Sequence, residues 1–430
     1  MRIISRSLNV NKEEPTEDLI KVFVPNMVEM KTILEDLQNM AIRRKDQKYS
    51  FSVLQTYLIT AIAGELNTLK AFKDEKVLKE NNSEILVNFE MTTRLMLNSL
   101  LQIADGIAFR FLDYDYSMFT LLQANKTSPS AILQDGFEAV LDLAGRLGDQ
   151  DGNTQELITD INQVTNIGDI ILKTEDYFEI IEVKKGRNKR GARINRQKER
   201  MDSLTTFINT SAGNLDGRNV KLFTAQSRRH SLDILQDCFK DAKMNGIASR
   251  MINSFQCVTC IDVDNLVATD RIDLMKTAQS LHREFWDTDE VFKLNSLDHR
   301  QVSGCSLPIT VFPFDTSLII DILMGSKIYI STINVSELIR YMNSKGWEVI
   351  ETTKILGIDE LEELDFPVFV LKSGNDPQYN FRFHIDFLVS CMMELIEIDG
   401  YLEIAKSIAN LENEETYYIP FYEKEDKIWN

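Results

Sequence analysis

Cysteine, proline and glycine are all scarce in this chain of 430 residues, which contains 5 Cys, 8 Pro and 18 Gly. A small, odd number of cysteines excludes a fold held together by disulfides. Apolar runs are short as well: none approaches the roughly 18 residues that cross a bilayer, and the first ten residues lack the order of a signal peptide. We therefore expect a soluble, helix-rich cytoplasmic protein that does not contact membranes.

Positive charge is also in the minority, with 48 Lys and Arg against 66 Asp and Glu and a net charge of -18. Averaged over the chain, this charge argues against nucleic-acid binding, because contacts to phosphate need Lys and Arg. The distribution changes that conclusion. Residues 184–200 contain nine basic residues and one acid, a local charge of +8, whereas the last eighty residues contain 18 acids and six bases. An isolated basic segment is more often a solvated surface. Whether this one binds a ligand is therefore inferred from the residues that precede it in the sequence.

Helical periodicity dominates the first third of the chain. Between residues 26 and 124, apolar residues recur at three- and four-residue spacing, most clearly over 51–72 and 84–111, which predicts amphipathic helices. A turn then leads into a further helix, predicted over 129–147. Its buried stripe is expected to consist of Leu133, Phe137, Val140, Ala144 and Leu147.

Two apolar runs of strand length follow, residues 168–173 and 177–184, with a short polar turn between them. Such runs predict a β-hairpin. A helix over 193–208 and strands over 219–226 and 255–263 are predicted next. With the helix in front, this order predicts an α/β fold with a mixed central sheet covered by helices.

The same order divides the chain into three predicted domains. They are a helical N-terminal domain over 1–128, a core over 129–263, and an acidic α+β domain over 264–430. The chain lacks the glycine-rich phosphate-binding motif G-x-x-x-x-G-K-[ST], which excludes a P-loop ATPase. We expect the catalytic residues in the core, residues 129–263.

The predicted hairpin brings two carboxylates together. Facing residues of an antiparallel pair have a constant sum of residue numbers, and a turn centred between Glu175 and Asp176 makes that sum 351. Asp169 then faces Glu182, with Cβ atoms about 4.5–5.5 Å apart. Lys184 lies on the same face, because strand side chains alternate with a period of two.

A pair of carboxylates at this distance repels by roughly 3 kcal/mol at an effective dielectric constant near 20. A divalent cation between them removes that cost, and oxygen ligands favour Mg²⁺ or Mn²⁺ over zinc. A lysine beside such an ion can position or deprotonate a water molecule aimed at phosphorus. Asp169, Glu182 and Lys184 therefore outline a site for phosphodiester hydrolysis.

The helix after the hairpin supplies the expected phosphate contacts. Gln197 is a polar residue on its inward face, next to Ile194, Met201, Leu204 and Ile208, and is expected to reach the metal site or a phosphate. Three arginines follow the neighbouring face at three- and four-residue spacing, which suits a nucleic-acid backbone. The predicted nucleic-acid contacts are Lys185, Arg187, Arg193, Arg196 and Arg200.

This arrangement resembles the PD-(D/E)xK nuclease superfamily. The residues that carry the resemblance are Glu138, Asp169, Glu182, Lys184 and Gln197. It implies a restriction-endonuclease-like core in which Asp169 and Glu182 bind Mg²⁺ and Glu138 completes the metal shell. It also implies that Lys184 assists the attacking water and that Gln197 has an accessory role.

The resemblance covers about residues 129–263, under a third of the chain. Gly168 stands where the name of the motif has Pro, and Met201 stands where an exonuclease-like branch has Tyr. Asp142, one helical turn after Glu138, could complete the metal shell in place of Glu138. Large flanking domains beside such a core resemble bacterial anti-phage and restriction effectors.

Two structural interpretations compete with these assignments. Asp169 could be a surface acid beside a turn, with Glu182 and Lys184 a solvated pair on the strand. Cys257 and Cys260 have the spacing of half a zinc site, but in a strand this spacing sends the side chains to opposite faces, so we interpret both as core thiols.

The leading hypothesis is a Mg²⁺- or Mn²⁺-dependent endonuclease that cleaves DNA in bacterial anti-phage defence. RNA is an alternative substrate, and a homo-oligomer or a partner protein of a defence complex is expected. One alternative function is a sequence-specific restriction endonuclease. The other is a non-catalytic subunit with a nuclease fold that binds nucleic acid or a partner.

Overall fold

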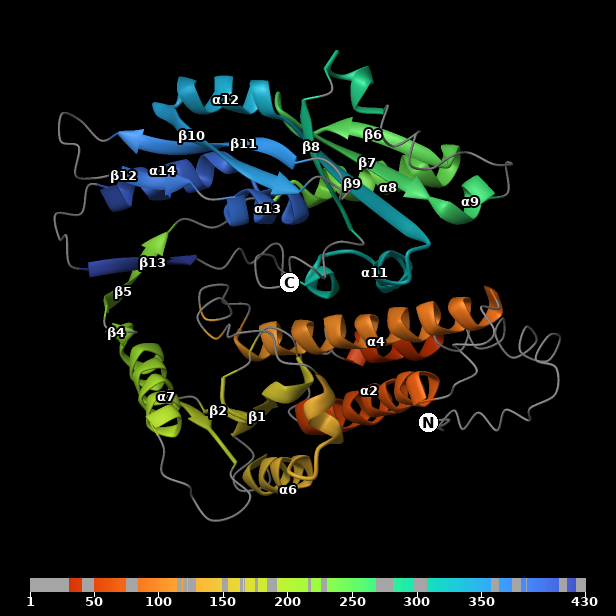
Figure 1. Ribbon diagram of the computed structural model, residues 1–430, viewed down its shortest axis with the longest axis vertical. Helices are drawn as coiled ribbons and strands as arrows, with labels where there is room; N and C mark the ends of the chain where they lie inside the picture. The colour runs from red at the N-terminus through yellow and green to blue at the C-terminus, as the bar shows by residue number, and fades with distance from the viewer. Residues whose placement is uncertain are drawn as a thin grey trace. The chain divides into compact units, whose positions relative to one another are not determined.

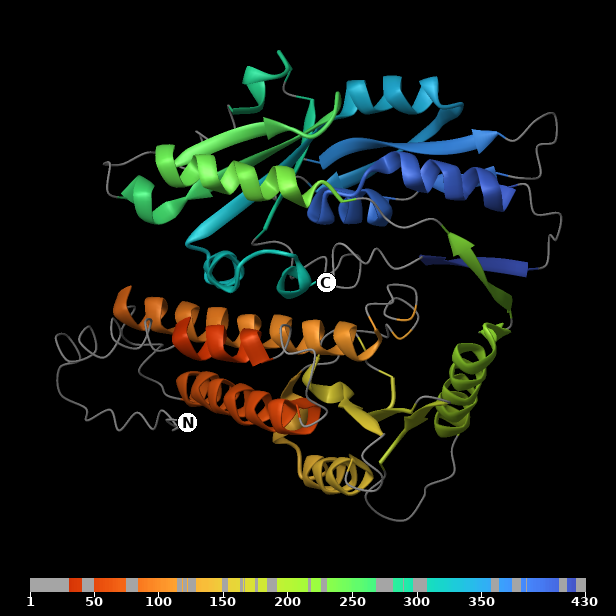
Figure 2. The ribbon, with the colours of Figure 1, turned by 180° about the vertical axis from the view of Figure 1, so that it is seen from behind.

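Figures 1 and 2 show a computed structural model of the chain from two opposite sides. The structure describes residues 31–40, 50–74, 84–113, 118, 122, 129–148, 154–162, 165, 167–174, 177–183, 192–215, 218–225, 230–267, 281–288, 290–296, 308–356, 363–372, 380–383, 385–409 and 416–422.

The chain forms two compact units. The first contains residues 1–220, 308–311 and 315–320, and the second contains 221–307, 312–314 and 321–430. The N-terminal helices, the hairpin and the basic helix thus belong to one unit. The predicted domain boundaries after residues 128 and 263 stay predictions.

Two long helices, α2 (Ser50–Asp74) and α4 (Glu84–Phe111), pack against each other in the first unit (Figure 1). They confirm the helices predicted over 51–72 and 84–111. Apolar side chains at three- and four-residue spacing form one buried face on each helix. The buried residues of these faces include Leu54, Leu58, Ile62, Leu100, Ile103 and Ile107.

The helix predicted over 129–147 is interrupted. A 3-10 helix, η2 (Pro129–Leu133), comes first, and the α-helix α6 (Phe137–Gly148) starts four residues later. The break moves Leu133 out of the predicted stripe, so that 39% of it is exposed, whereas Phe137 is buried together with Val140 and Ala144. The tighter winding of a 3-10 turn changes which residues share a face.

Three short strands form an antiparallel sheet of order β1-β2-β3. They are β1 (Gln155–Ile158), β2 (Ile170–Lys173) and β3 (Phe178–Ile181), and the 3-10 helix η3 (Thr159–Ile161) follows β1. The sequence pattern predicts β2 and β3 but not β1. Ile170 faces Ile181 and Lys173 faces Phe178, so the predicted register is confirmed.

The basic helix and the strands after it also form, but the strands join another sheet. The helix is α7 (Ala192–Thr210), and β4 (Ala212–Leu215) and β5 (Arg218–Ala225) follow it. β5 lies between β4 and β13 (Thr416–Tyr422) instead of pairing with β3. In place of one mixed central sheet, the described strands form several small sheets, antiparallel in the pairings among β1–β3, β6–β9 and β10–β12.

Side-chain amides close both edges of the β1-β2-β3 sheet. Gln55 on α2 donates to the carbonyl of Glu156 (2.9 Å) and accepts the N–H of Ile158 (2.7 Å). On the opposite edge, Asn209 on α7 accepts the N–H of Phe178 and donates to its carbonyl, both at 3.0 Å. A fourth strand would need these same backbone groups. The groups of Phe178 are therefore already occupied, and β5 pairs in a different sheet.

The second unit contains a four-stranded antiparallel sheet of order β6-β7-β9-β8. Its strands are β6 (Ile247–Met251), β7 (Gln256–Asp262), β8 (Val291–Asn295) and β9 (Lys327–Asn334). Helix α8 (Leu232–Asn245) packs against β6 and β7. Every residue of β7 is buried, which agrees with the apolar strand predicted over 255–263.

A smaller sheet of order β10-β11-β12 also belongs to this unit. Its strands are β10 (Trp347–Leu356), β11 (Glu363–Lys372) and β12 (Asn380–Phe383). Helix α12 (Val335–Ser344) lies on one side of it, and α13 (Ile385–Glu394) and α14 (Ile398–Ala409) lie on the other (Figures 1 and 2). Shorter helices are α9 (Val263–Val267) and α11 (Thr316–Leu323).

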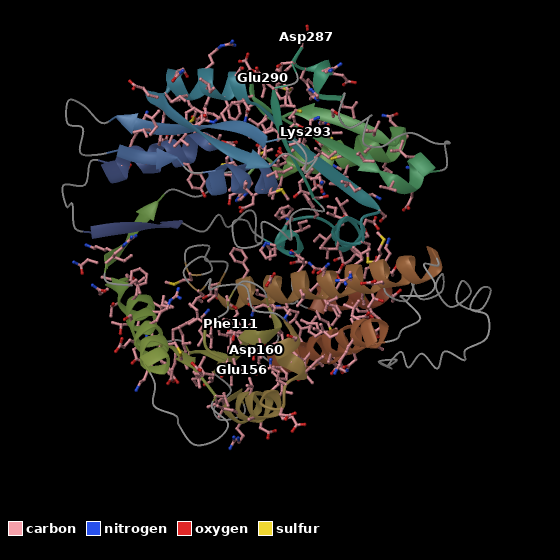
Figure 3. The ribbon with its side chains drawn as sticks, viewed as in Figure 1. Phe111, Glu156, Asp160, Asp287, Glu290 and Lys293 are labelled. Atoms are coloured by element: carbon pink, nitrogen blue, oxygen red, sulfur yellow. The ribbon has the colours of Figure 1, made fainter. Side chains whose placement is uncertain are left out.

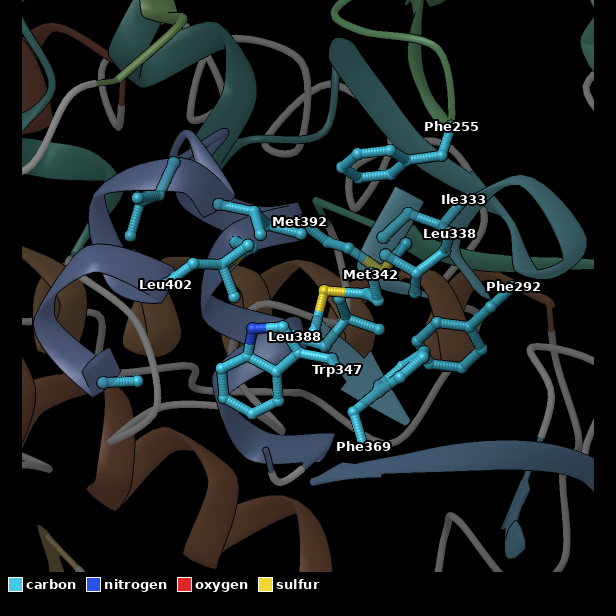
Figure 4. Close-up of a cluster of buried hydrophobic side chains, with 14 residues drawn as sticks. Phe255, Phe292, Ile333, Leu338, Met342, Trp347, Phe369, Leu388, Met392 and Leu402 are labelled. Atoms are coloured by element: carbon cyan, nitrogen blue, oxygen red, sulfur yellow. The ribbon is translucent and has the colours of Figure 1, made fainter. Parts of the chain in front are cut away.

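An apolar cluster joins these helices to the sheets of the second unit (Figure 4). Trp347 is its largest member and is 1% exposed. Its neighbours come from widely separated parts of the chain and include Phe255, Phe292, Phe369, Leu388 and Met392. Burial of such large side chains is the main source of stability of this unit.

The cysteines of β7 are core residues, as predicted. Cys257 and Cys260 are both fully buried and form no disulfide. The thiol of Cys260 donates to the carbonyl of Leu235 in α8 (3.9 Å), and the thiol of Cys238 in α8 donates to the carbonyl of Val258 in β7 (3.7 Å).

Among the described helices, none combines the length and the apolar character needed to span a membrane.

The edge closure by Gln55 predicts a specific loss of stability. In Gln55→Leu, the carbonyl of Glu156 and the N–H of Ile158 lose their buried partner, so the free energy of unfolding should fall by about 2 kcal/mol. Urea unfolding measures this change. Thr56→Ala, at the next and exposed position of α2, is the control and should change stability by less than about 0.5 kcal/mol. Equal effects of both substitutions would contradict the closure.

Candidate functional site

A sharp bend leads the chain into β2 and determines where Asp169 lies. Gly168 has a φ of +71°, a conformation that residues with side chains rarely adopt. A Cβ atom on it would approach Ile180 Cγ2 to 2.6 Å and the carbonyl oxygen of Ile181 to 2.9 Å. Proline, whose φ is about -65°, does not fit either. The glycine that departs from the name of the motif is therefore required by this bend.

Backbone and side chain of Asp169 both bind the end of β3. Its N–H donates to the carbonyl of Ile181 (2.8 Å), and its Oδ2 accepts the N–H of Val183. Regular pairing of the two strands ends at Ile170 and Ile181, one residue before Asp169 and Glu182. The hairpin thus brings Asp169 next to the segment that contains Glu182, and the Asp169 carboxylate contacts the backbone between Glu182 and Lys184.

Thr159 holds a further carboxylate beside Asp169. The N–H of Thr159 donates to the carbonyl of Asp169 (3.1 Å), and its hydroxyl donates to the carbonyl of Gly168 (2.6 Å). Asp160 is the next residue, labelled in Figure 3. Burial, and secondly the charge of Asp169, raise the pKa of Asp160 to about 6. Two carboxylates therefore share one partly buried environment.

Sequence reasoning missed Asp160 because it missed β1. The signal was present: Leu157 and Ile158 are apolar, and Thr159 and Asp160 follow them directly, so an acid stands at the end of a short buried strand. Glu156 of the same strand, also labelled in Figure 3, was missed as well, although only 4% of it is exposed. Four residues are too few for a clear alternating pattern.

The structure describes some of the other predicted site residues and not others. Glu138 lies in the first turn of α6 and is exposed, as is Asp142. Arg200 is exposed on α7. Three predicted residues, Lys184, Lys185 and Arg187, lie outside the described residues. Arg193, Arg196 and Gln197 belong to α7 by their backbone, but their side chains lie outside the described part.

The chemistry of Asp160 and Asp169 fits a divalent cation. Mutual repulsion raises the cost of ionising both carboxylates, and a cation between them would remove that cost. Mg²⁺ commonly binds only one or two protein carboxylates and keeps several water molecules. Within the part of the chain that is described, no three His, Cys, Asp or Glu side chains form a metal-binding group. The predicted set of Asp169, Glu182 and Glu138 stays a prediction.

Comparison of the chain with models of protein families, with curated proteins and with solved structures gives no match. The resemblance to PD-(D/E)xK nucleases therefore depends on the residues and on the geometry of the hairpin. The function has to be inferred from the chemistry of the site.

The bend at Gly168 predicts opposite effects of the same substitution at two glycines. Gly168→Ala should lower the free energy of unfolding by about 1–3 kcal/mol, because of its positive φ and the contact with Ile180. Gly145 lies in α6, where a Cβ atom meets nothing within 4 Å. Gly145→Ala is therefore the matched control and should raise stability by about 0.5–1 kcal/mol. Guanidinium unfolding followed by circular dichroism measures both, and a neutral Gly168→Ala would refute the bend.

The raised pKa of Asp160 predicts a pH-dependent stability. Its pKa is about 6 in the folded chain against 3.8 ordinarily, so the folded state binds the proton more tightly. The resulting stabilisation is complete below about pH 4 and is lost as the pH rises through 6.

Asp160→Asn removes this titration. At pH 7 the variant should be more stable than the wild type by about 1–2 kcal/mol, after allowance for solvent screening, with a smaller difference at pH 4. Unfolding in EDTA between pH 4 and 7.5 provides the comparison. Asp142→Asn, at an exposed position of α6, controls for the removal of one acid from an acidic chain. A difference that does not depend on pH would be inconsistent with the shift.

Proposed function

We propose that this chain is a nuclease that hydrolyses DNA phosphodiester bonds with Mg²⁺ or Mn²⁺. One observation carries the proposal. Asp160 and Asp169 lie close enough for the charge of Asp169 to raise the pKa of Asp160, beside the strand that leads to Glu182 and Lys184. Clustered carboxylates followed by a lysine are the groups that metal-assisted phosphodiester hydrolysis uses.

Each residue has a distinct role in this proposal. Asp169 and Glu182 would hold the cation, and Asp160 adds a carboxylate beside them. The N–H of Val183 restrains one oxygen of Asp169 and so orients its carboxylate. Lys184 would hold the attacking water or take a proton from it. A bound cation supplies a Lewis acid and lowers the pKa of that water.

Substrate binding is assigned to the basic segment. Residues 184–200 carry +8 in a chain of net charge -18, and Arg200 is exposed on α7. Positive side chains in this segment would neutralise phosphates, and the acidic remainder would repel DNA elsewhere. Affinity should therefore fall steeply as salt rises. RNA carries the same phosphates, so substrate choice is an outcome of the experiment.

The test is a cleavage assay on the full chain. Linear, circular and single-stranded DNA, and RNA, are incubated with Mg²⁺, with Mn²⁺ or with EDTA. Cleavage is expected with either metal and not in EDTA. Asp169→Ala and Lys184→Ala should each lower the rate by at least about 100-fold, the usual contribution of an acid–base group. Glu179→Gln, an exposed acid within β3, is the matched control and should cleave at the wild-type rate.

The products separate the candidate functions. Discrete fragments from a defined plasmid indicate a sequence-specific restriction endonuclease, whereas nicking or smearing indicates a less specific effector nuclease. DNA binding without cleavage or metal binding indicates a non-catalytic subunit. Wild-type rates in both Asp169→Ala and Lys184→Ala would refute the proposed catalytic site.

A further inference from the structure

One side chain joins the strand that leads to the catalytic residues to the helix that carries the basic face. Asn209, in the last turn of α7, accepts the N–H of Phe178 through Oδ1 and donates to the carbonyl of the same residue through Nδ2, both at 3.0 Å. Its Nδ2 also donates to the carbonyl of Thr205 in its own helix (2.9 Å). A contact at two points fixes the rotation of the helix about the strand, which a single hydrogen bond does not.

The position of this contact along the two elements is important. Phe178 starts β3, and Glu182 lies four residues further on, about 13 Å along an extended chain. Arg200 lies nine residues before Asn209, about 13 Å along a helix. Two arms of nearly equal length therefore extend from one contact. One arm leads to a proposed metal ligand and the other to a proposed phosphate contact.

The amide of Asn209 does more than stabilise the sheet edge. Asn209 is exposed, unlike Gln55 on the opposite edge, which is fully buried. The two hydrogen bonds to Phe178 are partly buried, so their loss lowers the stability of the sheet edge, and water replaces them only in part. What water cannot supply is a fixed angle between α7 and β3.

We propose that Asn209 is a positioning residue that holds the phosphate bound by α7 in line with the carboxylates of the hairpin. The inference rests on the proposed nuclease function. In hydrolysis assisted by a metal, a misplacement of about 1 Å between the phosphate and the reacting groups can lower the rate by about 100-fold. Affinity for DNA depends on the basic face of α7 alone and does not need this alignment.

The test separates catalysis from binding. In Asn209→Ala, kcat for DNA cleavage should fall by 10- to 100-fold, while the Kd for the same DNA in EDTA changes by less than threefold. Circular dichroism at the assay temperature verifies that the variant is folded. Hydrogen exchange should show that the amide of Phe178 loses protection.

Thr206→Ala is the matched control, because the hydroxyl of Thr206 bonds only within α7, to the carbonyl of Asp202. It should leave kcat, Kd and the exchange of Phe178 unchanged. The nearly isosteric Asn209→Asp serves the same comparison if the alanine variant does not fold. It loses the donor to the carbonyl of Phe178, so its kcat should also fall while its Kd in EDTA is retained.

Two failures can be told apart. If the wild type does not cleave nucleic acid under any condition, the proposed function fails and the positioning role fails with it. If the wild type cleaves and Asn209→Ala retains kcat within twofold, only the positioning role is wrong. A loss of kcat that equals the unfolded fraction would also overturn it, since Asn209 would then act through stability alone.

Discussion

The hydrogen bonds that close the two edges of the β1-β2-β3 sheet are the constraint on which the first unit depends. Three short strands by themselves are barely stable in water, and open edges invite further pairing. Gln55 satisfies β1 from α2, and Asn209 satisfies β3 from α7. The amides therefore occupy backbone groups of both outer strands and attach a helix to each side of the sheet. This explains how the N-terminal helices and the hairpin come to form one compact unit.

The candidate site is a consequence of that sheet. With β1 and β2 held together, the bend at Gly168 and the two bonds from Thr159 bring Asp160 beside Asp169. Burial and the charge of Asp169 make ionisation of Asp160 unfavourable, which raises its pKa. Such a cost is tolerated where a cation offsets it, and perturbed carboxylates are common at functional sites for that reason. The same feature is thus unfavourable for folding and useful for the proposed chemistry.

The charge is distributed unevenly along the chain, and this uneven distribution also supports the proposed function. In the proposed function, a net charge of -18 would keep nucleic acid away from most of the chain, and the +8 segment after β3 would concentrate the attraction in one place. Binding and hydrolysis would then meet where α7 follows the hairpin. The relation between these two elements is a matter of angles and not only of sequence distance, which is why a single amide such as Asn209 is important to the inferred mechanism.

The sequence by itself determined the local elements of this protein. A polar turn between two apolar runs was enough to predict the register of Ile170 with Ile181, because pairing in a hairpin follows from the centre of its turn. Periodicity was likewise enough for α2, α4 and α7.

Tertiary structure alone decided that α6 starts at Phe137, that β5 pairs elsewhere and that Asp160 joins Asp169. These outcomes depend on contacts between residues far apart in the chain, such as Gln55 with Ile158, and no local pattern encodes them. The described strands therefore form several small sheets in place of the one mixed central sheet that was predicted.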